Sequence, residues 1–150
     1  MPQTPQKKKV AIYPRVSTNM QAAEGHSLQT QEEFCREYCD REFGPDGYEE
    51  TVYVEPGQSG ANTIRQFADD GDRVRPVLSD LCDDVEQGEI THVVTYEVSR
   101  MAREGFLWKL IRHTILEPKD VSLRIVSGNL NLDNEDDAFM ADMLSLVSSR

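Results

Sequence analysis

The sequence predicts an α/β protein with a mostly parallel central sheet of four to five strands and helices on both faces. Short segments rich in β-branched or aromatic residues alternate along the chain with longer segments in which apolar residues recur at helical spacing. Elements that alternate in this way form right-handed βαβ units, in which parallel strands lie side by side. The 150 residues suit one compact domain with a real core.

The predicted strands are short segments without glycine or proline, and they lie at 10–13, 51–54, 92–96 and 122–126. Helices are predicted at 28–43, 77–86 and 106–116, because each carries one apolar face. Their apolar positions are Leu28, Phe34, Cys35 and Tyr38; Val77, Leu78, Leu81, Cys82 and Val85; and Phe106, Leu107, Leu110, Ile111 and Ile115.

Two further segments differ from this alternation. Residues 55–76 contain several glycines and little periodicity, which is typical of a functional or disordered loop. The segment 136–150 begins with acids that suit a helix N-terminus and places apolar residues on one face, without a stop signal at its end. We therefore expect that the chain breaks inside a helix, so that it is either a fragment or a chain with an unpaired apolar stripe that binds a partner.

Charge and cysteines narrow the possible functions. The net charge of −11 argues against binding nucleic acid by bulk electrostatics, but the acids are densest at 32–50, 80–89 and 133–142. A local cationic site therefore remains possible. Cys35, Cys39 and Cys82 show no CxxC spacing, so buried thiols are expected and no metal or other cofactor is. No apolar run approaches the roughly 20 residues of a membrane span, and we expect a cytoplasmic protein.

The stretch IYPRVSTNMQ, residues 12–21, contains the first candidate nucleophile, Ser17. A serine hydroxyl needs a base or local positive charge to react, and here the companions are arginines rather than a histidine or a GxSxG elbow. Arg15, Arg100 and Arg103 each follow closely after a predicted strand, so they should converge on the carboxyl edge of the sheet. Guanidinium groups match phosphate oxygens, which indicates phosphoryl transfer.

Each of these features alone has an ordinary explanation. An arginine and a serine after a strand are common loop residues, and Arg100 and Arg103 could form the solvated face of a helix start. The combination in one chain favours a site.

The ordered motifs IYPRVSTNMQ, HSLQTQ at 26–31, SG at 59–60 and VVTYEVSRMAR at 93–103 resemble the catalytic domain of the serine site-specific recombinases, the resolvase/invertase family. The spacer AAEGHSL is similar to that of the large serine integrase branch. The resemblance runs from about residue 9 to the end. It implies a polar leader at 1–8, a catalytic domain at 9–135, and the start of the long oligomerisation helix at 136–150.

The resemblance also implies a reaction. Ser17 would attack a DNA phosphate, form a 5′-phosphoserine bond and free a 3′ hydroxyl, without metal or ATP. Arg15, Arg100 and Arg103 match arginines that bind the scissile phosphate. Gln21 and Ser59 match polar residues near that phosphate, and Gln31 is expected to support the helix behind the site.

One further arginine is ambiguous, since counting forward from Gly60 selects Arg65 and counting back from Arg100 selects Arg75. We prefer Arg75, because helix register is harder to shift than loop length, and residues 61–74 would then contain an insertion. Ser99 stands where most relatives have aspartate. Glu97, on the same side of a strand, is hypothesised to take over part of its orienting role.

The expected partner is DNA, bound mainly through domains beyond this chain, with a homodimer and a homotetramer in the full protein. The alternative is a non-catalytic recombinase-like module that acts in protein interaction, for which Ser99 is the sequence hint. A small-molecule phosphatase is disfavoured, because no general base or metal-ligand set accompanies Ser17.

Overall fold

A five-stranded sheet forms the centre of the molecule, in a computed structural model that describes residues 7–14, 27–54, 63–96, 105–127 and 129–132. The strand order is β2-β1-β3-β4-β5. The strands are β1 Lys8–Ile12, β2 Tyr48–Val52, β3 His92–Thr95, β4 Ser122–Ile125 and β5 Leu130–Asn131. The first four pair in parallel and β5 pairs antiparallel with β4. The predicted fold class is confirmed.

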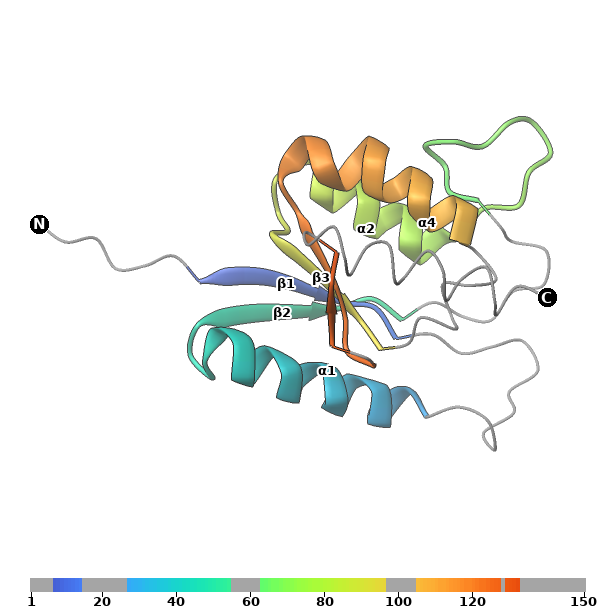
Figure 1. Ribbon diagram of the computed structural model, residues 1–150. Helices are drawn as coiled ribbons and strands as arrows, with labels where there is room; N and C mark the ends of the chain where they lie inside the picture. The colour runs from blue at the N-terminus through green and yellow to red at the C-terminus, as the bar shows by residue number, and fades with distance from the viewer. Residues whose placement is uncertain (1–6, 15–26, 55–62, 97–104, 128, 133–150) are drawn as a thin grey trace, which may run out of the picture.

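Helices cover both faces of the sheet (Figure 1). Helix α1, Leu28–Phe43, packs on one face, while α2, Pro76–Glu86, and α4, Gly105–Ile111, lie on the other. Alternate residues of a strand point to opposite faces. In β1, Val10 and Ile12 accordingly join the core on the α1 side, and Ala11 joins the larger core on the α2 and α4 side.

The helix ends follow local chemistry. Ser27 caps α1, with its hydroxyl accepting a hydrogen bond from the backbone N–H of Thr30 at 3.1 Å. Gly44 ends α1 with a φ of 83°, which a residue with a Cβ rarely adopts. Pro76 is the first residue of α2, where its missing N–H costs nothing.

Several element boundaries differ from the prediction, and the largest differences are in β1, in β2 and in the helix predicted at 106–116. β1 begins at Lys8, and β2 runs from Tyr48 instead of residue 51. The two strands pair beyond the apolar residues, through residues whose side chains are mostly exposed and give no apolar signal in the sequence. The predicted helix at 106–116 is α-helical only to Ile111, and a π-helix, Arg112–Leu116, follows. Leu110, predicted on the buried face, is 36% exposed, since Leu107, Ile111 and Ile115 already form the buried stripe.

The segment 136–150 lies outside the described residues. Within the described ranges, none of the helices combines the length and the apolar character that crossing a bilayer requires.

Candidate active site

Three chain segments leave the sheet at one edge, directly before the stretches that carry the sequence motifs (Figure 1). β1, β2 and β3 are parallel neighbours, so their carboxyl ends lie side by side. The last described residues after them are Pro14, Val54 and Tyr96. Ligands of open parallel sheets bind at this edge, beyond the carboxyl ends of the strands.

Buried contacts fix the exits from β1 and β3 relative to one another. The Tyr13 backbone N–H donates to the carbonyl of Val94 at 3.0 Å, and the buried hydroxyl of Thr95 donates to the carbonyl of Tyr13 at 3.1 Å. The ring of Tyr13 also packs edge-on against Trp108 of α4, with 5.9 Å between centroids. These contacts hold Tyr13 in place against β3 and α4.

Most of the predicted site residues lie beyond these exits. Arg15, Ser17, Gln21, Ser59, Arg100 and Arg103 are outside the described residues, as are Glu97 and Ser99. Gln31 is described and is buried in α1 at 3% exposure. The described part of the site therefore consists of the strand ends that precede these residues in the chain and of Arg75.

Arg75 is the described arginine at this edge. It is the N-cap residue of α2, and it is 5% exposed. Helix α2 crosses back from β2 to β3, so its N-terminus lies at the carboxyl edge of the strands (Figure 1). A cation and a helix N-terminus at this edge both favour a bound anion.

Arg65 occupies a different environment. Its guanidinium forms ion pairs with Asp80 at 2.7 Å and Asp83 at 2.8 Å, on the outer side of α2, and its side chain is 47% exposed. The hydrogen bonds that Arg65 donates to Asp80 and to Asp83 raise the pKa of Arg65 above its ordinary value. These carboxylates engage the Arg65 guanidinium at the surface of α2.

Residues 63–75, the pre-α2 loop, form a loop whose two ends are hydrogen-bonded to each other. Thr63 and Val74 form an isolated parallel bridge, and the backbone N–H of Arg75 donates to the carbonyl of Thr63 at 2.9 Å. Ile64 is fully buried in the core. Because the two ends of the loop meet, its residues can vary in number without moving α2, which agrees with an insertion at this place.

Two features of α2 were not predicted from the sequence: a hydrogen bond from Tyr53 to Asp84, and the complete burial of Ser79. The Tyr53 hydroxyl, just after β2, donates to the carboxylate of Asp84 at 2.6 Å, and burial with this bond raises the pKa of Tyr53. Ser79 is a fully buried polar residue in the first turns of α2. The position of Ser79 four residues after Arg75 was its one available signal, because a helical serine can bond to the carbonyl four residues earlier.

The described cysteines are not nucleophiles. Cys35, Cys39 and Cys82 are buried free thiols, as predicted, and burial raises the pKa of each to about 12. A thiol reacts as its thiolate, so these groups are inert near neutral pH.

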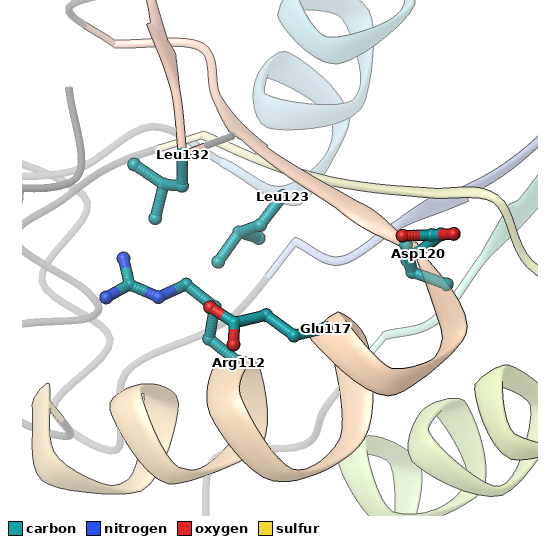
Figure 2. A pocket seen from close by; sticks show the side chains of 6 residues that line it. Arg112, Glu117, Asp120, Leu123 and Leu132 are labelled. Carbon is teal, nitrogen blue, oxygen red and sulfur yellow. The ribbon is translucent and has the colours of Figure 1, made fainter. Parts of the chain in front are cut away.

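A shallow pocket lies elsewhere, near the amino end of β4 (Figure 2). Leu123 and Leu132 form part of its wall, and Arg112, Glu117 and Asp120 give it charges of both signs. This mixed lining matches no single class of ligand, and the pocket is separate from the carboxyl edge.

The described fold defines a class, a mostly parallel α/β domain with a buried arginine where a crossover helix begins. Within that class, residues 10–150 match the family described as Resolvase, N terminal domain. The chain belongs to this family, whose catalytic domains serve site-specific recombination.

Two proteins are similar to this chain in sequence, and the aligned region makes up a different share of each. A putative DNA recombinase of Bacillus subtilis (strain 168) is 28% identical over 136 residues, which make up 88% of this chain and 23% of the relative. The chain thus spans about a quarter of that protein. The uncharacterized immunity region protein 3 of Bacillus phage phi105 is 38% identical over 85 residues, 57% of this chain and 88% of the relative.

Solved structures share the fold. The N-terminal catalytic domain of TP901-1 integrase superposes with a TM-score of 0.66 at 21% identity, covering 93% of each chain. A resolvase family site-specific recombinase from Streptococcus pneumoniae gives a TM-score of 0.58 at 25% identity, covering 95% of this chain and 86% of the other.

Proposed function

We propose that this chain is the catalytic domain of a serine recombinase that cuts and rejoins DNA through a covalent serine intermediate. The observation that carries the proposal is the convergence of three strand exits at one edge of the sheet, each leading into one of the motif segments. Membership of the resolvase family supports it.

In the proposed reaction, the Ser17 oxygen attacks a DNA backbone phosphorus and loses its proton. A phosphoserine bond forms to the 5′ end, the bond between phosphorus and the 3′ oxygen breaks, and that oxygen takes up a proton. The ester conserves the energy of the broken bond, so attack by another 3′ hydroxyl rejoins the strands and restores Ser17. No metal or nucleotide is required for the balance of the step.

The arginines carry the electrostatic part of the proposal. Charge on the phosphate oxygens grows in the transition state, and fixed cationic donors stabilise it. Arg15, Arg100 and Arg103 are assigned to this task with Arg75. Gln21 and Ser59 are assigned to binding near the phosphate, and Glu97 to orienting an arginine in place of the aspartate replaced by Ser99.

DNA and further copies of the protein are the proposed partners. The acidic composition means that this domain alone should bind DNA weakly and in a salt-sensitive way. The remaining domains of the full-length protein are proposed to supply most of the affinity, and the helix predicted to start at 136 the dimer and tetramer contacts.

The test uses the full-length protein and a DNA site with a nick close to the cleavage position, so that a short fragment diffuses away and traps the intermediate. The wild type should form a covalent protein–DNA adduct, and Ser17→Ala should form none. Ser122→Ala is the matched control, because Ser122 is buried at the amino end of β4, away from this edge, and it should form the adduct normally. A folded wild type that forms no adduct would select the non-catalytic alternative.

A further inference from the structure

Ser79 makes a pair of hydrogen bonds that join α2 to the pre-α2 loop. Its hydroxyl donates to the carbonyl of Arg75 at 2.5 Å and accepts from the backbone N–H of Arg65 at 3.1 Å. The residue is completely buried. The hydroxyl therefore donates one hydrogen bond and accepts another, and its two partners are backbone groups near opposite ends of the pre-α2 loop.

Gln66 reinforces the same connection. Its side-chain nitrogen donates to the carbonyl of Ser79 at 3.0 Å and to the carboxylate of Asp83 at 2.7 Å. The start of the loop is thereby held against the first two turns of α2. Ser79 is the fully buried member of this network, so water cannot replace its bonds.

The network acts on the backbone of Arg75. Pro76 disfavours the helical conformation for Arg75, which has φ −88° and ψ 107°. The N–H of Arg75 is bonded to Thr63, and its carbonyl accepts both the N–H and the hydroxyl of Ser79. Since the backbone fixes the direction in which a side chain leaves it, these bonds set the origin of the Arg75 guanidinium at the carboxyl edge.

We propose that Ser79 is a positioning residue for phosphoryl transfer, acting through Arg75. Its hydroxyl holds the backbone of Arg75 against the pre-α2 loop, so that the guanidinium is in place before the transition state forms. This inference rests on the proposed function and on the assignment of Arg75 to the phosphate. A misplacement of about 1 Å at such a group is enough to cost on the order of 100-fold in rate.

The test measures single-turnover cleavage by the full-length protein at saturating DNA, with the half-saturating DNA concentration and the melting temperature of each variant. Ser79→Ala removes both side-chain bonds, and its cleavage rate should fall on the order of tenfold or more while half-saturation stays within about twofold. Ser79→Thr keeps the hydroxyl and should recover most of the rate. Ser122→Ala is again the control, because it also removes the hydroxyl of a buried serine, one that accepts from Arg124 at 2.8 Å.

A double-mutant cycle separates positioning from general stability. In an Arg75→Lys background, Ser79→Ala should cause little further loss of rate, because both changes remove the same contribution. If the two losses multiply, or if Ser79→Ala cleaves as fast as Ser122→Ala, the inference is wrong. Ser79→Cys, which keeps a side-chain donor and acceptor but weakens both bonds, carries the same test if Ser79→Ala does not fold.

Failure of the positioning role and failure of the proposed function give different outcomes. Cleavage that survives Ser17→Ala would contradict the serine mechanism itself. Cleavage that requires Ser17 but is indifferent to Ser79 would contradict only the positioning role.

Discussion

Arg65 and Arg75 lie at the two ends of the same loop and contact the same helix, yet their surroundings differ in kind. Arg65 is half exposed on the outer side of α2, and two carboxylates already neutralise it. Arg75 is buried at the helix N-terminus, and bonds to its neighbours fix its backbone. Two arginines ten residues apart in one loop thus differ through the folded chain around them, and not through residue type or spacing.

The largest expected effect separates the two arginines directly. Arg75→Lys keeps the charge but loses the planar fork of donors, and DNA cleavage by the full-length protein should fall roughly 100-fold or more. Arg65→Lys should leave the single-turnover rate within about threefold, because its partners are surface carboxylates whose contribution is small. Equal losses in both variants would remove the distinction, and a loss confined to Arg65→Lys would reverse the assignment.

The next effect is on stability, and it concerns Ile64, which anchors the pre-α2 loop in the core. Ile64 is fully buried, so Ile64→Ala should lower the free energy of unfolding by about 2–5 kcal/mol through lost burial and a cavity. Chemical denaturation monitored by circular dichroism measures this loss. Ile64→Val is the matched control, with an expected loss of about 0.5–1.5 kcal/mol. If Ile64→Ala were no more costly than its control, the core would not anchor the loop.

A smaller effect is expected at Pro76. Pro76→Ala frees the conformation of Arg75 and enlarges the conformational freedom of the unfolded chain, which should cost roughly 0.4–1 kcal/mol of stability. Cleavage should slow as well, by less than in Arg75→Lys. A variant with lower stability but an unchanged cleavage rate would show that Ser79 and Thr63 alone suffice to place Arg75.

The smallest effect is expected for the ion pairs of Arg65. Arg65→Ala should lower the melting temperature less than Ile64→Ala does, and the difference from wild type should shrink as salt is added. Thermal melts at low and high ionic strength measure it. A difference that persists at high salt would mean that Arg65 stabilises the loop by packing rather than by charge.

Much of the fold could be predicted, because it depends on local signals. Helix α1 has its predicted bounds, since Ser27 and Gly44 mark both ends in the sequence. β2 starts earlier than predicted, because the acids at its beginning have exposed side chains on an edge strand and give no apolar signal. The change from α-helix to π-helix at Arg112 has no marker in the sequence either.

The site was predictable as a set of motifs, and much less so as an arrangement. The preference for Arg75 came from helix register and stays a prediction, and the structure adds that Arg75 is buried and that Arg65 pairs with two carboxylates. The spacing of Ser79 from Arg75 could suggest its bond to the Arg75 carbonyl, but its bond to Arg65 depends on the path of the loop and could not be predicted. Contacts between segments of a long loop and a helix depend on the folded chain, which periodicity does not encode.

Ser17 is the proposed nucleophile of a phosphoryl-transfer site at the carboxyl edge of this sheet. The most direct test is to trap the adduct of the full-length protein on nicked DNA, digest it with protease and nuclease, and locate the modified residue by mass spectrometry. We expect a peptide in which the Ser17 oxygen carries a nucleotide joined through its 5′ phosphate. A nucleotide on any other residue, or on none when the protein is folded and bound to its DNA, would contradict this proposal.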